Sequence, residues 1–314
     1  DPVLASDFFY AWRRVALPDC GADYSDMFDV IRGVPEWSRR RQGDLEAFAK
    51  DRSIADRPAA ARELLRHAEE AFARDVGIVT PDPRTIRIEL REPVPYFLDY
   101  IAFVPFLPLH ERTVRAFESV DPETGRVSWA SDWTRPPLLN GNGPYRLTLW
   151  RFQRDMRLER NPQYHDPALP RLATLSIVNI TDANATVTAF RTGAVDWTTD
   201  VMAPYRPEMI AARRAFEAEH ATEIAGYRAR GLGPLEVARQ LPDDERNRIQ
   251  GLPSFGTYFL SLNCQPTLAN GRPNPLADAR VRRALALAAE KRQVVENIRR
   301  TGEPVAGSLI PPGS

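Results

Sequence analysis

Apolar side chains recur at helical spacing in two early segments of the chain, residues 5–16 and 58–76. In the first segment the stripe consists of Phe8, Phe9, Trp12 and Val15. This spacing predicts an amphipathic helix, which Ser6 or Asp7 can cap and Pro18 ends. In the second segment one side carries Leu64, Leu65, Ala68, Phe72 and Val76, which predicts another amphipathic helix.

Alternation of apolar and polar residues predicts strands farther along the chain. Residues 85–90 place Ile86, Ile88 and Leu90 on one face, as in a half-buried strand. Residues 145–150 and 156–160 flank the turn formers 153–155 and predict a hairpin. Further strands are expected at residues 172–180, 195–198 and 255–264. The apolar run of residues 96–106 is expected to fill the core as helix and loop.

Helical patterns also occur between these strands. They are found at residues 182–191, 205–220, 234–250, 277–289 and 291–300. The first of them begins at the capping residue Asp182 and ends at Gly193. Strands therefore alternate with helices in an irregular order, which favours a mixed α/β fold over a sandwich or a helical bundle.

Composition narrows the class of protein. The 314 residues contain 42 Lys+Arg and 42 Asp+Glu, and this balance argues against a surface that follows nucleic-acid phosphates. No stretch reaches the roughly 20 apolar residues of a membrane-spanning helix. At about 150 residues per domain, the length fits one large domain or two ordinary ones. Lys50 and Lys291 are the only lysines, which we interpret as a consequence of codon usage.

Cysteine, histidine and glycine patterns supply no metal or catalytic motif. Cys20 and Cys264 are far apart in the sequence and are expected to remain unbridged. The histidines lack zinc-ligand spacing, and no GxSxG, P-loop or GxGxxG occurs. The glycine-rich residues 140–145 are interpreted as a tight turn with positive-φ glycines, and residues 243–245 as a solvated helix start. We therefore expect no cofactor and no enzymatic activity.

Four segments, taken in order, resemble one protein family. They are residues 1–13 (DPVLASDFFYAWR), 82–97 (DPRTIRIELREPVPYF), 142–164 (NGPYRLTLW and LERNPQY) and 258–285 (YFLSLNCQ and DARVRRAL). This sequence is similar to the solute-binding protein family 5 of ABC importers, whose best-known members bind oligopeptides or dipeptides. Leu4 stands where the family usually has a capping threonine, and His165 where it usually has tryptophan. Residues 226–252 look like an insertion, to which no role is assigned.

The resemblance implies an α/β fold of the type II periplasmic-binding-protein kind, a bilobal clamp with an extra domain. It also implies that the chain is the central portion of such a protein, truncated at both ends. We accordingly expect residues 1–143 to form the extra domain of the second lobe. Residues 144–264 should form the α/β sheet domain of the first lobe, and residues 265–314 the start of a third domain.

The resemblance further implies a receptor that delivers peptides to the permease subunits of an ABC importer. Such a receptor holds an extended peptide between its lobes, mainly through main-chain pairing. We expect a monomer in the periplasm or elsewhere outside the cytoplasm, attached to the membrane only by a lipid anchor outside this segment. Nucleic acid is not an expected partner. The same fold binding a sugar or a metal chelate, and a clamp domain of an enzyme or a regulator, remain open alternatives.

The candidate ligand contacts are Tyr24, Asp200, Phe259, Ser261 and Asn263. Strand alternation turns Phe259, Ser261 and Asn263 away from the core, toward the cleft that the resemblance implies. The even-numbered residues Tyr258, Leu260 and Leu262 are expected to enter the core. Tyr24 falls where the resemblance implies a tyrosine that contacts the peptide. Asp200 follows the expected strand 195–198, where the resemblance implies a loop beside the ligand main chain.

Overall fold

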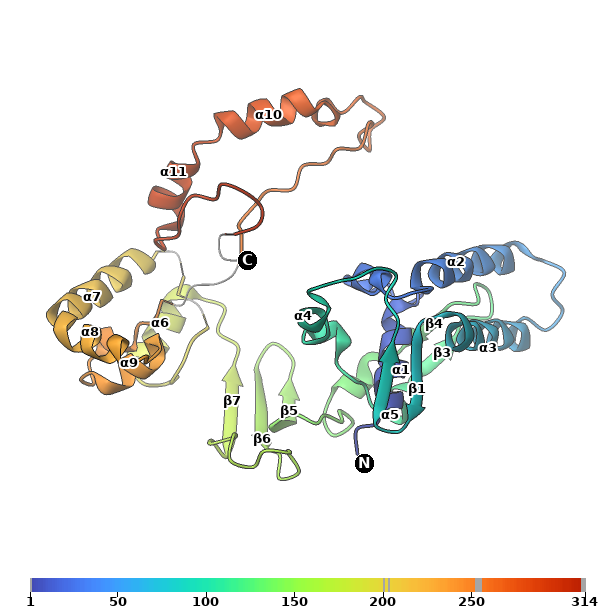
Figure 1. The fold of residues 1–314 in the computed structure, drawn as a ribbon, viewed down its shortest axis with the longest axis horizontal. Coiled ribbons are helices and arrows are strands. Elements are labelled where there is room, and N and C mark those ends of the chain that lie inside the picture. Colours follow the sequence, from blue (N-terminus) through green and yellow to red (C-terminus); the bar gives the residue numbers. More distant parts are fainter. Residues whose placement is uncertain (1, 200, 203, 252–255, 312–314) are drawn as a thin grey trace. The chain divides into compact units, whose positions relative to one another are not determined.

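The computed structural model describes residues 2–199, 201–202, 204–251 and 256–311 of the chain (Figure 1). These residues form two compact units, Asp1–Asn179 and Ile180–Ser314. Helices and antiparallel strands occur in mixed order in unit 1, in agreement with the predicted α/β class. The expected division into residues 1–143, 144–264 and 265–314 stays a prediction.

Unit 1 contains helices, short 3-10 turns and three small sheets. Its helices are α1 (Ala5–Ala16), α2 (Val34–Lys50), α3 (Arg57–Asp75), α4 (Phe97–Ile101) and α5 (Glu111–Arg115), with 3-10 turns η1 (Ser25–Val30), η2 (Val104–Phe106) and η3 (Ser131–Thr134). Its strands are β1 (Ile78–Asp82), β2 (Thr85–Ile88), β3 (Glu118–Val120), β4 (Val127–Trp129), β5 (Tyr145–Arg151), β6 (Asp155–Arg160) and β7 (Thr174–Val178). They pair antiparallel in the orders β1-β2, β3-β4 and β5-β6-β7.

Helix α1 lies in the core of unit 1 and has the predicted bounds. Trp12 is 2% exposed, and its indole Nε1 donates a hydrogen bond of 2.8 Å to the Phe106 carbonyl. Tyr10 and Ala11 are also buried, so the helix is covered beyond the predicted stripe. Asp7 caps the helix from inside, because its Oδ2 accepts a hydrogen bond of 2.8 Å from the Leu4 backbone nitrogen. The core continues through α2, α3, β1 and η1.

The strand prediction for residues 85–90 is confirmed on its buried face. Ile86, Ile88 and Leu90 pack against the core of unit 1, and β2 pairs with β1. The predicted hairpin is likewise confirmed as β5 and β6, although Asp155 belongs to the strand and not to the turn.

Two polar anchors tie the helices of unit 1 to the β3–β4 hairpin. Arg41 donates through Nε and Nη2 to both carboxylate oxygens of Asp19, at 3.0 and 2.7 Å, and through Nη2 to the Gly125 carbonyl. Gly125 has a φ of +70°, and a Cβ there would lie 2.9 Å from Leu64, so glycine is needed at this turn. Both side chains of the ion pair are almost wholly buried.

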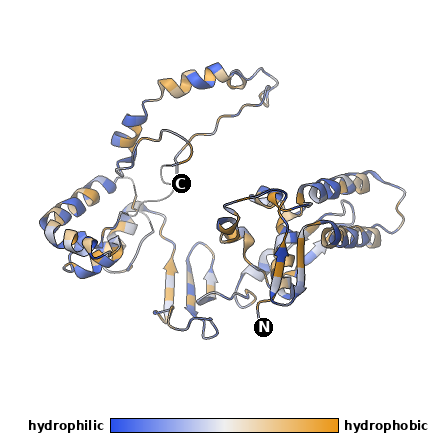
Figure 2. Ribbon diagram, viewed as in Figure 1, coloured by the Kyte–Doolittle hydropathy of each residue, from blue (hydrophilic) through white to orange (hydrophobic). Residues whose placement is uncertain are grey.

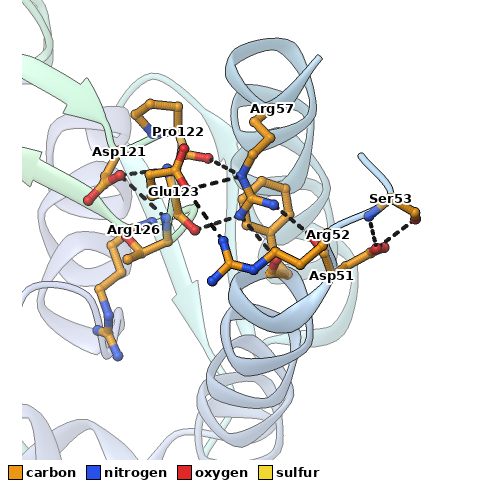
Figure 3. Close-up of polar contacts among 10 residues, drawn as sticks. Asp51, Arg52, Ser53, Arg57, Asp121, Pro122, Glu123 and Arg126 are labelled. Carbon is orange, nitrogen blue, oxygen red and sulfur yellow. Dashed lines mark hydrogen bonds and ion pairs between the residues drawn. The ribbon is translucent and has the colours of Figure 1, made fainter. Parts of the chain in front are cut away.

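Arg57 supplies the second anchor at the start of α3. Its guanidinium donates to the backbone carbonyls of Phe48, Asp51, Pro122 and Glu123 (Figure 3). The guanidinium carbon also lies 4.7 Å from the centre of the Phe48 ring. One side chain thus links the end of α2 to the β3–β4 turn.

The glycine-rich loop before β5 differs from its prediction. Neither Gly141 nor Gly143 adopts a positive φ. The buried Asn161 holds the loop instead, because its Nδ2 donates to the Gly143 carbonyl at 2.8 Å and its backbone nitrogen to the Pro144 carbonyl at 2.9 Å. Side-chain hydrogen bonding from a neighbouring segment here replaces the left-handed turn.

The β5-β6-β7 sheet exposes much of its apolar surface. Figure 2 shows hydrophobic residues along β7, and Ile177 and Val178 are 47% and 48% exposed. The predicted strand 172–180 is therefore confirmed as an element, while its apolar face lacks a covering layer among the described residues of unit 1.

Unit 2 is mainly helical in its described residues. Its helices are α6 (Ala183–Arg191), α7 (Arg206–Glu219), α8 (Ala221–Ala229), α9 (Pro234–Gln240), α10 (Ala279–Ala288) and α11 (Lys291–Gln293), with short turns η4 (Glu245–Arg248) and η5 (Pro275–Ala277) and the π-helical turn η6 (Val294–Arg299). The predicted helix 234–250 is wrong as one element, because Pro242 separates α9 from η4. Asp244 begins η4 and accepts from the Arg246 backbone nitrogen, as expected for a solvated helix start.

Residues 226–252, the apparent insertion, take part in a small cluster of their own. Val237 and Leu241 are buried against Phe216 of α7 and Ile224 of α8. Arg213 and the buried Asn247 join the polar side of the same group, with Arg213 Nη1 2.7 Å from Asn247 Oδ1. Described residues of this segment therefore pack with α7 and α8 in a small helical group.

The strands predicted at 195–198 and 255–264 are wrong for the residues that the structure describes there. Residues 195–198 and 256–264 have no ladder hydrogen bonds to a described neighbour. Tyr258, Leu260 and Leu262, which were expected in the core, are 67%, 79% and 40% exposed. Strand-like alternation alone cannot form a strand, because the backbone donors and acceptors need a neighbouring chain.

Candidate ligand-binding site

Tyr24 lies at the start of η1, at the end of the loop that follows α1. Its side chain is 51% exposed, and its ring makes an edge contact with Phe103, with 5.1 Å between centroids and an interplanar angle of 88°. Phe103 is itself 39% exposed. Two aromatic rings from segments far apart in the sequence thus form one accessible surface.

A buried aromatic pair fixes the position of this exposed pair. Phe28, four residues after Tyr24, stacks on Phe106, three residues after Phe103, with 4.1 Å between ring centroids. Phe28 and Phe106 are 0% and 1% exposed. Because η1 and η2 each present one ring inward and one outward, packing in the core sets the geometry of Tyr24 and Phe103 at the surface.

Tyr96 and Tyr100 continue the surface along α4. Their ring centroids are 5.1 Å apart, Tyr96 is 51% exposed, and the Phe103 backbone nitrogen donates to the Tyr100 carbonyl at 2.9 Å. We call Tyr24, Tyr96, Tyr100 and Phe103 the aromatic strip. Leu98, Val104 and Leu107, nearby in the sequence, are also exposed. The prediction that residues 96–106 fill the core is confirmed for the buried Phe106 and for Phe97, Tyr100 and Ile101, which pack against the core. Leu98 and Val104 of the same stretch are instead exposed.

Phe259, Ser261 and Asn263 lie in the extended segment 256–264 of unit 2. Phe259 is 60% exposed, and Ser261 and Asn263 are exposed as well. The placement of these three side chains on one ligand face stays a prediction. The opposite set is equally accessible, so the structure does not separate a core face from a ligand face here.

The side-chain oxygen of Asn263 already makes a local hydrogen bond. Its Oδ1 accepts from the Gln265 backbone nitrogen at 3.0 Å. The buried Asn274 donates through Nδ2 to the carbonyls of Asn263 and Gln265, at 2.8 Å each, and so fixes the chain just after the segment. The Asn263 amide nitrogen remains the group that can meet a ligand acceptor.

Asp200 lies outside the described residues. Tyr24 belongs to unit 1, whereas Phe259, Ser261 and Asn263 belong to unit 2. Sequence reasoning missed Phe103, Tyr96 and Tyr100 as candidates, although their aromatic spacing beside prolines is visible in the sequence. Only the contact between η1 and η2 shows that Phe103 extends the surface of Tyr24.

The rest of the described chain offers little alternative chemistry. A cavity of about 440 Å³ beside α3 and β3 is lined by charged residues, which include Arg62, Arg66, Glu69 and Glu118. Within the described residues, no group of three or more His, Cys, Asp or Glu side chains is placed to hold a metal ion. Both cysteines are free thiols. No helix in the described part of the chain is both long and apolar enough to cross a bilayer.

Comparison with known proteins places these features in a family. The family model for bacterial extracellular solute-binding proteins, family 5 middle, matches residues 1–314. The periplasmic oligopeptide-binding protein OppA of Salmonella typhimurium is 25% identical over 99% of this chain and 43% of its own length.

Two solved structures share the fold. The murein tripeptide-binding protein MppA of Escherichia coli has a TM-score of 0.64 at 20% identity and is matched over 100% of this chain and 46% of its own. OppA of Listeria monocytogenes, solved bound to peptide, has a TM-score of 0.62 at 20% identity, over 99% of this chain and 46% of its own. The chain thus spans less than half the length of these relatives. The structural matches confirm the type II binding-protein fold. This chain belongs to the bacterial extracellular solute-binding proteins of family 5.

Proposed function

We propose that this protein is a peptide-binding receptor of an ABC importer. The observation that carries the proposal is the match of the whole chain, residues 1–314, to a family of extracellular solute-binding proteins. Several relatives are named as oligopeptide-binding or dipeptide-binding proteins, which supports a peptide as the solute. In this role the protein works outside the cytoplasm and delivers its ligand to the permease subunits without chemical turnover.

Two features of the chain fit the binding of an extended peptide. Residues 256–264 have no assigned helix or strand, and their backbone donors and acceptors make no ladder hydrogen bonds to described residues. Such a backbone can pair with a ligand main chain, which gives affinity independent of ligand sequence. The exposed rings of Tyr24 and Phe259 can add contact with ligand side chains. Asp200, Ser261 and Asn263 are proposed to complete the contacts.

Calorimetric titration of the full-length protein with a mixed peptide library tests this function. Tyr24→Ala and Phe259→Ala should each weaken peptide binding by about 1–2 kcal/mol, as for a non-dominant aromatic contact at an interface. Two exposed aromatic residues that we do not place in the site serve as matched controls. Phe152→Ala, 75% exposed in unit 1, and Tyr258→Ala, 67% exposed beside Phe259, should leave the affinity unchanged.

Three outcomes contradict the proposal. Binding of a sugar or a metal chelate without binding of any peptide would assign another solute to the same fold. Equal losses in Tyr258→Ala and Phe259→Ala would remove the proposed ligand face of residues 256–264. Conversion of the peptide to products during titration would show an enzyme.

A further inference from the structure

The aromatic strip of unit 1 has an unpaired carboxylate beside it. Asp26 lies in the first turn of η1, two residues after Tyr24, and its side chain is exposed. In the described part of the chain, no arginine, lysine or histidine nitrogen lies within 4.0 Å of this carboxylate. Many other carboxylates of the chain are paired with arginines, whereas the Asp26 carboxylate is open to a ligand.

Asp26 lies on the same short turn as the Tyr24 end of the strip, since Tyr24 directly precedes η1 and Asp26 is its second residue. Burial raises the pKa of the Tyr100 hydroxyl, the neighbouring Tyr96 adds to the rise, and the negative charge of Asp26 contributes as well. Burial also raises the pKa of the Asp29 carboxyl, and Asp26 again adds to that rise. Arg91 and Arg39 act against this rise at Asp29.

Exposed aromatic faces with one carboxylate match the chemistry of a guanidinium group. A guanidinium is planar, always charged and weakly hydrated, so it stacks on rings more readily than an ammonium does. The same chain shows this preference internally. The guanidinium carbon of Arg14 lies 4.5 Å from the Trp129 ring centre and 5.8 Å from that of Trp133, and that of Arg115 lies 5.2 Å from the Tyr10 ring centre.

We propose that the aromatic strip, with Asp26 as counter-ion, binds the guanidinium of an arginine side chain in the peptide ligand. The inference rests on the proposed function and adds a preference to it. Main-chain pairing accepts any sequence, whereas this surface favours one residue type at one position of the ligand. Tyr24 and Phe103 supply the rings for stacking, and the Asp26 carboxylate accepts hydrogen bonds from the guanidinium.

The test compares peptides that differ in one charge. Affinities of the full-length protein are measured by calorimetry for a peptide series in which one arginine is moved along the sequence, and for matched peptides with citrulline, which keeps the shape and loses the charge. At the recognised position, arginine should bind about tenfold more tightly than citrulline, the scale of a partly desolvated cation–aromatic contact. N-acetylated peptides should keep this ratio, because the recognised group is the side chain and not the α-ammonium.

Variants assign the effect to the strip. Asp26→Asn and Phe103→Leu should each bring the arginine-to-citrulline ratio close to one. Asp29→Asn is the matched control, since it removes a charge from the same turn but next to Arg91 and Arg39. It should preserve the ratio. Melting temperatures of all variants are recorded alongside.

The possible failures are distinguishable. If peptides bind but arginine and citrulline bind equally at every position, the inference is wrong and the proposed function stands. If acetylation abolishes the preference, the guanidinium is not recognised independently of the α-ammonium and the inference is wrong. If Phe103→Leu lowers the melting temperature without changing the ratio, the strip is a packing surface within the protein, and the inference is again wrong. If no peptide binds at all, the proposed function and the inference fail together.

Discussion

Helix α1 of unit 1 and the segment 256–264 of unit 2 both carry strongly apolar patterns, yet their surroundings differ completely. Trp12 in α1 is 2% exposed, whereas Leu260 in the segment is 79% exposed. Helix α1 satisfies its own backbone hydrogen bonds and then needs only neighbours to cover its side chains. The segment needs a paired strand before it can present a stable face at all.

The neighbours of α1 are all present in unit 1. It packs on β1, η1 and η2, among others. The described part of unit 2 has the small cluster around Phe216, and several of its other long apolar residues, such as Leu287 and Trp197, are exposed. An apolar pattern therefore indicates what an element can bury, while the presence of partners decides whether it does.

The largest expected difference in unfolding free energy between the two units comes from a pair of tryptophan substitutions. Trp12→Ala should lower the free energy of unfolding by about 3–5 kcal/mol, because it leaves a cavity and removes the hydrogen bond to Phe106. Trp197→Ala, at a site 76% exposed, should change it by less than about 0.5 kcal/mol. Urea unfolding followed by circular dichroism measures both. A large loss for Trp197→Ala would show that the exposed residues of unit 2 are packed in solution.

Ion pairs extend the comparison to charged groups. Asp19→Asn should cost about 3 kcal/mol, because Arg41 would keep a buried charge without its counter-ion. The pair of Arg248 and Asp243 in unit 2 is exposed, with side-chain exposures of 60% and 81%. Arg248→Gln should therefore cost less than about 1 kcal/mol. Equal losses of unfolding free energy for the two variants, measured by chemical denaturation, would show that burial does not determine what an ion pair contributes.

The smallest expected effect is a pH dependence in unit 1. Burial raises the pKa of the Glu118 carboxyl above its ordinary 4.5, and Glu69 adds to the rise while Arg115 opposes it. The folded state then binds the proton more tightly than the unfolded state does. The stabilisation from protonated Glu118 is therefore complete below pH 4.5. It is lost as the pH rises through the pKa of Glu118 in the folded state. Glu118→Gln should remove this loss, as measured by thermal unfolding between pH 4 and 7.

Glu63 provides a control of opposite sign. Its pKa is held below the usual range by hydrogen bonding to Arg66 at the surface. Its contribution is therefore present above the unfolded pKa and is lost as the pH falls. If Glu63→Gln and Glu118→Gln shift the pH profile in the same direction, the assigned cause for Glu118 is wrong.

Sequence reasoning was accurate where an element depends on its own residues. Helix α1 begins and ends where predicted, and Ile86, Ile88 and Leu90 face the core as their alternation implied. It failed for residues 256–264, where strand formation depends on another chain segment, and for Gly141 and Gly143, where Asn161 holds the loop. Of the candidate site, Tyr24 was nominated from the resemblance, but its partner Phe103 was not.

Membership of the family and the type II fold are readable from the printed residues alone, because motifs such as NGPYRLTLW and helical periodicity are local properties. The aromatic strip is not, because Tyr24 and Phe103 meet only through the stacking of Phe28 on Phe106. Contacts between residues so distant in sequence follow from packing of the whole core, in which shape and volume choose among many apolar partners. Local pattern therefore decides which elements form, and long-range packing decides which side chains they present together.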